Sequence, residues 1–189
     1  MARWQPGAPE RLQAAALKRF AEQGYDGTTV AEIAATAGLT ERTFFRYFAD
    51  KREVLFYGRE AFERVFIDGI EKAEDGNALS IVAQALLRAG DFFGDDRRER
   101  SRARQAVIAS DPSLQERELL KLSALAESMA GALRARGINA TAATLAAESG
   151  VAAFRVAFTS WIADGERRSL AECQEEALVE LRALLDPAS

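Results

Sequence analysis

Two arginines, Arg42 and Arg46, lie four residues apart in the segment TERTFFRYF, and Thr43 stands between them. A guanidinium group can donate two hydrogen bonds to O6 and N7 of guanine, and a threonine can contact a thymine methyl group or a phosphate. Residues four apart share one face of an α-helix. The spacing therefore predicts a helical face that reads base edges in the major groove of DNA, provided that neighbouring residues anchor the helix.

The expected anchors of this helix are Phe44 and Phe48, which also lie four apart but on the opposite side. Thr40 can cap the first turn with its hydroxyl group. Because each residue turns a helix by about 100°, Arg42 and Arg46 then face outward. Two buried aromatic rings and two outward guanidinium groups on one short helix are the features of a recognition helix.

The preceding element is also predicted to be a short helix. Thr29 and Glu32 form a capping box, in which each side chain accepts a backbone N–H of the other residue. Small and apolar residues recur at helical spacing over 30–37, and Gly38 stands where a helix ends with a residue of positive φ. The segment 29–48 thus predicts a helix-turn-helix, whose first helix crosses the DNA backbone and whose second enters the major groove.

Each of these features also has a purely structural interpretation. Amphipathic helices before a glycine turn are common, and exposed arginines are most often solvated charge. The combined spacing of caps, glycine turn and outward arginines favours the DNA-reading interpretation.

The composition argues against several other classes of protein. The chain has 189 residues, no histidine and a single cysteine, Cys173. These counts argue against an intrachain disulfide, imidazole-dependent metal sites and histidine-dependent catalysis, so we expect no enzyme activity and no cofactor. No apolar run approaches the roughly 20 residues of a membrane span, and the N-terminus lacks the apolar core of a signal peptide. We therefore expect a cytoplasmic protein with no membrane partner.

The net charge of −4 is unevenly distributed along the chain. Residues 1–52 contain eight Lys/Arg and six Asp/Glu, whereas residues 53–189 contain 17 and 23. A mildly basic N-terminal part can bind phosphate locally although the remainder is acidic. We accordingly predict a helix-turn-helix DNA-binding domain over 1–52 and a helical domain over 53–189.

The predicted fold is all-α, with about nine helices and no strand. Beyond the helix-turn-helix, the patterns predict helices over 10–23, 51–71, 79–93, 111–136, 141–162 and 169–185. Gly58 and Gly69 are expected inside the helix over 51–71, where they permit close packing or bending. The charged stretch 97–104 is interpreted as solvated surface, because its arginines are interleaved with acids.

The segment from about Glu10 to Leu55, which contains RLQAAALKRFAEQGYDGTTVAEIAATA and GLTERTFFRYFADKREVL, closely resembles the N-terminal DNA-binding domain of the TetR family of bacterial transcriptional regulators. The resemblance implies a three-helix DNA-binding domain followed by a C-terminal helical ligand-binding and dimerisation domain. It further implies a ligand-responsive repressor that binds a pseudo-palindromic operator in double-stranded DNA as a homodimer. A small apolar or amphipathic effector would release the repressor from the operator. The alternatives are a transcriptional activator or a helical protein-interaction module with the same N-terminal domain.

The resemblance also implies the DNA-binding residues, which are Thr29, Thr40, Arg42, Thr43, Phe45, Arg46, Tyr47 and Lys51. Thr29, Thr40, Tyr47 and Lys51 stand where relatives clamp phosphates. Phe45 departs from the family pattern, because many relatives carry a tyrosine there whose hydroxyl reaches the DNA backbone. We expect an apolar contact from Phe45 instead.

Two further sets of residues follow from the resemblance. The effector pocket would be lined by Phe62, Phe66, Phe92, Phe93, Arg104, Met129, Phe154, Arg155, Phe158 and Trp161. Its apolar members can equally be ordinary core, and its arginines can pair with a ligand anion or with an internal carboxylate. The dimer interface on the last two helices would contain Ala146, Ala153, Ala157, Leu178, Leu181 and Leu185. These residues can instead form an intrachain core.

Overall fold

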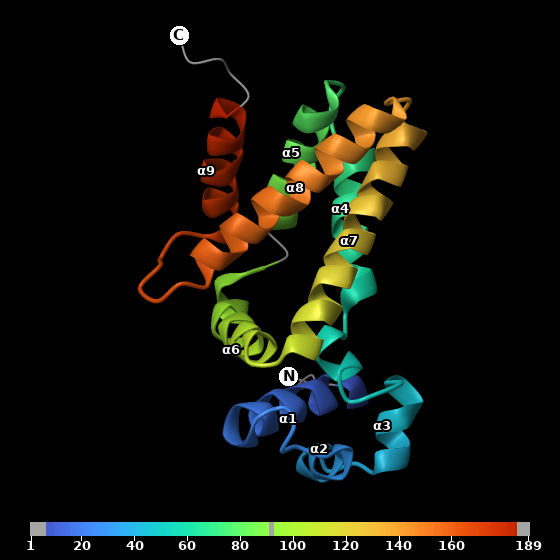
Figure 1. The fold of residues 1–189 in the computed structure, drawn as a ribbon, viewed down its shortest axis with the longest axis vertical. Helices are drawn as coiled ribbons and strands as arrows, with labels where there is room; N and C mark the ends of the chain where they lie inside the picture. Colours follow the sequence, from blue (N-terminus) through green and yellow to red (C-terminus); the bar gives the residue numbers. More distant parts are fainter. Residues whose placement is uncertain (1–6, 91–92, 185–189) are drawn as a thin grey trace, which may run out of the picture. The chain divides into compact units, whose positions relative to one another are not determined.

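The computed structural model describes residues 7–90 and 93–184, and every regular element in these ranges is helical (Figure 1). The predicted all-α fold is therefore confirmed. Within the described residues the nine α-helices are α1 (Ala8–Gln23), α2 (Val30–Thr36), α3 (Glu41–Tyr47), α4 (Arg59–Glu71), α5 (Ala78–Gly90), α6 (Arg98–Ala109), α7 (Pro112–Ala135), α8 (Ala140–Trp161) and α9 (Leu170–Ala183). Short 3-10 helices cover Glu53–Phe56 and Asp95–Arg97.

Side-chain caps begin three of these helices at the predicted positions. At the start of α2, Thr29 accepts the N–H of Glu32, and Glu32 accepts the N–H of Thr29. Thr40 caps α3 by accepting the N–H of Thr43, and Ser169 opens α9 with a second capping box. Because these bonds satisfy amides that a helix start leaves unpaired, they fix where α2, α3 and α9 begin.

The prediction of one continuous helix over 51–71 is wrong. After the 3-10 helix, Tyr57 is extended with φ −61° and ψ 142°, and Gly58 has a φ of 85°. Glycine adopts this left-handed conformation readily because it has no Cβ. Gly58 therefore separates the 3-10 helix from α4, which begins at Arg59.

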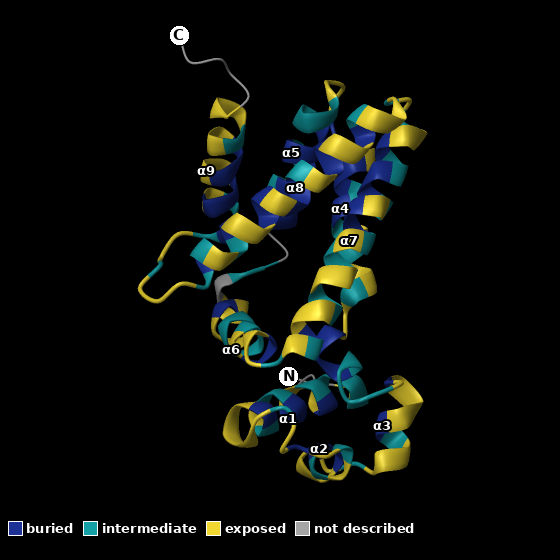
Figure 2. Cartoon of the chain, in the orientation of Figure 1, coloured by how far each residue is buried: buried dark blue, intermediate teal, exposed yellow. Residues whose placement is uncertain are grey.

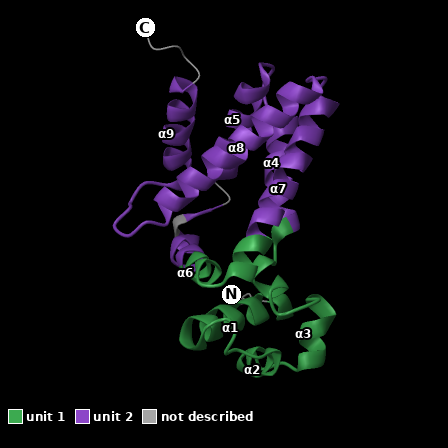
Figure 3. Ribbon diagram, in the orientation of Figure 1, with its two compact units in different colours: residues 1–59, 103–117 green, residues 60–102, 118–189 purple. Residues whose placement is uncertain are grey.

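The chain forms two compact units (Figure 3). Unit 1 comprises the residues up to 59 together with 103–117, and unit 2 comprises 60–102 and the residues from 118 onward. This division differs from the predicted boundary at residue 52. The reason is that apolar side chains beyond that boundary are buried in the core of unit 1, namely Val54, Leu55, Phe56, Val107, Ile108 and Leu114.

Unit 2 is built around α5, which packs closely against α4, α8 and α9. A Cβ on Gly69 of α4 would lie 2.8 Å from the Cα of Ala85, and a Cβ on Gly150 of α8 would lie 2.3 Å from Cγ1 of Val82. A Cβ on Gly90, at the end of α5, would lie 2.9 Å from a side-chain atom of α9. In a close-packed interior these distances admit no added carbon, so glycine is required for the three crossings. The close packing expected for Gly69 is thus confirmed.

Candidate functional sites

Helix α3 has one buried side and one exposed side, as predicted (Figure 2). Phe44 is fully buried and Phe48 is 4% exposed, and their ring centroids lie 5.2 Å apart in the core of unit 1. Arg42 and Arg46 are both exposed, and Phe45 between them is 55% exposed. The helix therefore presents two guanidinium groups and a phenyl ring to solvent from a fixed backbone.

The turn before α3 is held by the backbone and by a side chain from α1. Gly38 has a φ of 66°, and the N–H of Leu39 donates to the carbonyl of Ala34 over 2.8 Å. Arg11 of α1 donates from Nη2 to the carbonyl of Ala37, one of the unpaired carbonyls at the end of α2. Arg11 thus fixes the turn that sets the direction of α3. Sequence reasoning missed it, because no local pattern connects an arginine of the first helix with the end of the second.

The two outward arginines differ in their surroundings. Arg46 donates from Nη2 to the hydroxyl of Tyr47 over 2.8 Å, and its guanidinium lies 4.7 Å from the centre of that ring. Among the described residues no hydrogen bond or ion pair engages Arg42. A ligand can therefore bind Arg42 without breaking a protein contact, whereas Arg46 is oriented by Tyr47.

The threonines of the predicted DNA contact set use their hydroxyl groups within the protein. Thr29 donates to Oε2 of Glu32 over 2.8 Å, and the hydroxyls of Thr40 and Thr43 lie 3.0 Å apart. The hydrogen bonds from Thr29 to Glu32 also lower the pKa of that carboxyl. These hydroxyls position α2 and α3, and their contact with phosphate stays a prediction.

Lys51 is bound to the loop between α1 and α2. Its ammonium donates to the carbonyl of Tyr25 over 2.6 Å and to that of Thr28 over 2.9 Å. The same nitrogen lies 4.1 Å from the centre of the Tyr25 ring. Burial raises the pKa of Tyr25 to about 12, so the ring that faces the ammonium carries no charge near neutral pH. We therefore assign Lys51 to holding this loop.

Replacing Lys51 with Met should lower the free energy of unfolding by about 1–3 kcal/mol, because two carbonyls lose a charged donor. If Lys51 serves only to hold this loop, the salt dependence of DNA binding should stay unchanged. Chemical denaturation and binding titrations at several salt concentrations measure the two effects. Lys18→Met is the control, because the pair of Lys18 with Glu22 is exposed and 3.9 Å long. Unchanged stability with a shallower salt slope would instead identify Lys51 as a phosphate clamp.

The aromatic residues predicted for an effector pocket come together in unit 2. We define the aromatic cluster as Phe62, Phe66, Phe93, Phe154, Phe158 and Trp161. Neighbouring centroids lie 4.9 to 6.2 Å apart, and most pairs meet edge to face. Met129 is fully buried in the same core, and Phe92 lies outside the described residues. These rings therefore pack against one another and form one connected apolar cluster.

The two arginines predicted for the pocket lie elsewhere. Arg155 is exposed on the surface of α8. Arg104 belongs to unit 1, where its Nε donates to the carbonyl of Leu55 over 2.9 Å and its guanidinium lies 5.1 Å from the ring of Phe56. Neither arginine therefore belongs to the aromatic cluster.

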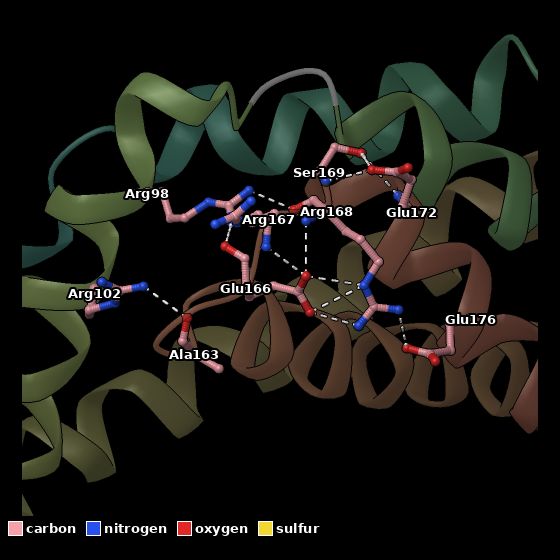
Figure 4. Close-up of polar contacts among 9 residues, drawn as sticks. All are labelled: Arg98, Arg102, Ala163, Glu166, Arg167, Arg168, Ser169, Glu172 and Glu176. Atoms are coloured by element: carbon pink, nitrogen blue, oxygen red, sulfur yellow. Dashed lines mark hydrogen bonds and ion pairs between the residues drawn. The ribbon is translucent and has the colours of Figure 1, made fainter.

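The expectation that the stretch 97–104 is solvated surface holds for Arg97, Glu99 and Arg100, which are exposed, but is wrong for Arg98 and Arg102 (Figure 4). Arg98 is 8% exposed and donates to the carbonyls of Glu166 and Arg168 in the loop before α9. Arg102 donates to the carbonyl of Ile162, the residue that caps the end of α8, and to that of Ala163, which follows it. The end of a helix leaves its last carbonyls without partners within the helix, and Arg102 supplies a donor there.

The loop that the arginines bind has its own hydrogen-bond network, also drawn in Figure 4. Glu166 accepts the N–H groups of Arg167 and Arg168 and the guanidinium of Arg168. These bonds lower the pKa of Glu166 to about 2. Arg168 also pairs with Glu176 over 3.0 Å, so the loop is linked to the body of α9.

The residues predicted for a dimer interface lie mostly inside the protomer. Ala146, Ala153, Ala157 and Leu178 are at most 6% exposed, so the intrachain alternative describes them correctly. Leu181 is half-buried, and Leu185 lies outside the described residues.

A different apolar stripe is exposed on the same two helices. It comprises Leu145 and Val156 of α8, exposed to 64% and 61%, Ala152 between them, and Val179 of α9, exposed to 58%. We call these four residues the outer stripe. It follows the same helical period as the buried alanines, displaced by one position along each helix. The sequence-based choice of dimer-interface residues therefore fell on the buried positions, and the position of a dimer interface stays a prediction.

Comparisons with known proteins agree with the helix-turn-helix geometry. Residues 12–57 match the family model described as bacterial regulatory proteins, tetR family. The chain is 36% identical over 94 residues to the HTH-type transcriptional regulator TcmR of Streptomyces glaucescens, a match that covers 46% of this chain and 42% of TcmR. The chain spans about half the length of the curated relatives it matches.

Solved structures share the fold along nearly the whole chain. The complex of SmeT with triclosan has a TM-score of 0.62 at 22% identity, covering 94% of this chain and 90% of SmeT. SmeT is the repressor of the Stenotrophomonas maltophilia multidrug efflux pump SmeDEF. The regulator FadR of Bacillus subtilis, in complex with stearoyl-CoA, has a TM-score of 0.57 at 19% identity, covering 91% of this chain and 96% of FadR. None of the helices in the described part of the chain is long and apolar enough to span a membrane.

Proposed function

We propose that this chain is a transcriptional repressor that binds operator DNA through α3 and is released by a small molecule. The match of residues 12–57 to the model of bacterial regulatory proteins of the tetR family supports the proposal. The observation that carries the proposal is the two-sided α3. Phe44 and Phe48 anchor the helix, and Arg42 and Arg46 extend from its exposed side. Helices of this kind read the major groove, where an arginine can recognise guanine with two hydrogen bonds.

A single α3 supports only a few base contacts. Each correct contact contributes about 1–3 kcal/mol of discrimination, which is too little to select one site in a genome. Two copies of the chain would double the contacts and would recognise inverted half-sites about 34–36 Å apart or somewhat more. The proposed operator is therefore pseudo-palindromic and the proposed DNA-binding form is a homodimer.

The outer stripe is the surface that we propose for dimerisation. The outer stripe lies on α8 and α9, which pack against each other within the protomer. Its side chains are exposed on these two neighbouring helices. Large exposed apolar side chains that gather on one surface are typical of protein interfaces. In a twofold dimer the same stripe would meet its own copy, as isologous interfaces do.

Changing Leu145 and Val156 together to Glu should convert the dimer into monomers, because four carboxylates would be brought together in a twofold apolar interface. Light scattering coupled to size exclusion measures the mass, and an operator gel shift should show loss of binding. Leu119→Glu is the matched control, since Leu119 is an exposed leucine of α7 that lies outside the outer stripe. Dissociation by the control and not by the double variant would place the interface elsewhere.

Release by a small molecule is supported by the fold and by the aromatic cluster. SmeT and FadR share the fold, and their solved structures contain triclosan and stearoyl-CoA, respectively. In this chain the aromatic cluster gathers six aromatic rings in unit 2, and three of them, Phe62, Phe93 and Phe158, are only half-buried. We propose that an apolar effector binds among these rings and favours a conformation that does not bind the operator.

The proposed function is tested with the DNA immediately upstream of the chain's own gene, because regulators of this kind often control themselves and a neighbouring gene. A gel shift should show a complex that survives competitor DNA, and DNase footprinting should show an inverted repeat. Candidate effectors are then titrated into the complex. Binding that is no tighter than to unrelated DNA, at several upstream fragments, would contradict the proposal.

A further inference from the structure

Two buried polar side chains of unit 2 have no hydrogen-bond partner. Trp161 is fully buried and Gln174 is 1% exposed. Among residues 7–90 and 93–184, nothing forms a hydrogen bond with Nε1 of Trp161 or with either amide atom of Gln174. Buried polar atoms without partners are rare in native proteins, because the folded state loses the hydrogen bonds that water supplied. A bound molecule that supplies those bonds would explain why the chain retains both groups.

Both side chains lie at the end of α5. A Cβ on Gly90, the last residue of α5, would lie 3.0 Å from Oε1 of Gln174. The ring of Trp161 lies 5.9 Å from that of Phe93, and the N–H of Phe93 donates to the carbonyl of Gly90 over 3.1 Å. A chain of contacts through Gly90 and Phe93 therefore links the amide of Gln174 to the ring of Trp161.

The aromatic cluster supplies an apolar surface next to these polar groups. Trp161 belongs to the cluster, and its ring also lies 5.7 Å from that of Phe158. Phe62, Phe93 and Phe158 are half-buried, so the cluster extends from the core to the surface of unit 2. A flat ring system could replace or separate these side chains and still make edge-to-face contacts of the kind that the rings make with one another.

The charged groups near the cluster are already engaged. The guanidinium of Arg98 lies 5.3 Å from the centre of the Trp161 ring, but it donates to the carbonyls of Glu166 and Arg168. Glu63, which follows Phe62, accepts a hydrogen bond from the hydroxyl of Ser128. The N–H donors of Arg98 that face these carbonyls are already used, and Glu63 would repel an anion, so an ionised ligand would lose its hydration without gaining a new ion pair here.

We infer that the molecule bound here is a neutral aromatic lactam or carboxamide, whose rings enter the aromatic cluster and whose amide edge pairs with Gln174. A primary amide side chain offers one donor and one acceptor side by side, and a lactam presents the complementary pair. The indole N–H of Trp161 donates to a further acceptor on the ligand. This inference rests on the proposed function, because it names the chemical class of the effector.

Isothermal titration calorimetry with three small probes tests the inference on the full chain. Quinolin-2(1H)-one is a neutral aromatic lactam, 1-methylquinolin-2-one lacks its N–H, and 2-naphthoate is an anion of similar size. The lactam should bind about tenfold or more tightly than its methyl derivative, because the carbonyl of Gln174 would otherwise stay unpaired. The naphthoate should bind more weakly still. Equal affinities for the lactam and its methyl derivative, or no binding of the lactam, would overturn the inference.

Gln174→Leu gives a second, independent measurement. The variant should reduce the preference for the lactam to within about threefold and should raise the melting temperature of the free protein, because an unpartnered amide is replaced by an apolar group. Gln84→Leu is the matched control, since the amide of Gln84 is bonded to the backbone of Glu74 and its loss should not raise the melting temperature. A lower melting temperature for Gln174→Leu would show that the amide is satisfied in the free protein and would refute the inference.

The titrations contain no DNA, so the two proposals can fail separately. A protein that binds the lactam but stays on its operator would contradict release by a small molecule and would leave the lactam site standing. A protein that other compounds release from its operator, but that does not bind the lactam, would refute the lactam site. It would leave the proposal of release by a small molecule standing.

Discussion

A protein that carries Arg42→Ala and Arg46→Ala should lose sequence-specific operator binding while it keeps its fold and its oligomeric state. Two arginine–guanine pairs contribute about 2–6 kcal/mol of discrimination in each half-site, so the affinity of the dimer for the operator should fall at least roughly 30-fold towards that for unrelated DNA. Both side chains are exposed and neither is part of the core of unit 1, so the melting temperature should hardly change. Fluorescence anisotropy with operator and scrambled DNA measures the effect.

The matched control for this pair is Arg64→Ala with Arg88→Ala. These residues are exposed on α4 and α5 of unit 2, and the control removes the same charge. It should leave the ratio of operator to scrambled affinity unchanged. If the control reduces this ratio as much as the α3 variant does, then net charge and not base reading accounts for binding.

Phe44→Ala should destabilise unit 1 by about 3–5 kcal/mol, a large part of the roughly 5–15 kcal/mol that holds a domain together. Phe44 is fully buried, and its ring contacts those of Phe45 and Phe48 at 5.5 and 5.2 Å. Its removal leaves a cavity beneath α3, so DNA binding should also fall at temperatures where the variant unfolds. Urea denaturation followed by circular dichroism gives the change in free energy.

Phe45→Ala is the control for this change, because the same side chain is removed one position along the helix. Phe45 is 55% exposed, and its truncation should alter the free energy of unfolding by about 1 kcal/mol or less. A comparable loss of stability in both variants would mean that α3 does not have the two sides described above.

The recognition helix could be predicted from the sequence because its determinants are local. The capping box of Thr29 and Glu32, the cap at Thr40 and the positive φ of Gly38 all lie within a few residues of the elements they begin or end. The spacing of Phe44 and Phe48 fixes the buried side in the same way. Such features depend on residues that are only a few positions apart, so they can be predicted from local sequence patterns.

Features that depend on distant partners could not be predicted. Arg98 and Arg102 looked like solvated charge, but they bind carbonyls 60 to 70 residues later in the chain. The sequence pattern predicts Gly58 inside a helix, whereas the structure gives it a positive φ that ends the preceding 3-10 helix. Glycine adopts positive and negative φ about equally well, so its residue type alone does not distinguish the two cases. The outer stripe was missed because small residues such as alanine fit both a core and an interface.

The three glycine crossings around α5 limit how the body of this protein can change in evolution. Gly69, Gly90 and Gly150 exclude even a methyl group, so the backbone arrangement of α4, α5, α8 and α9 tolerates almost no variation at those points. The aromatic side chains of the same unit pack through their rings, and exchanges between apolar side chains of similar volume usually cost little stability. A lineage can therefore acquire a response to a new compound through a few ring substitutions, while the helical frame is inherited unchanged.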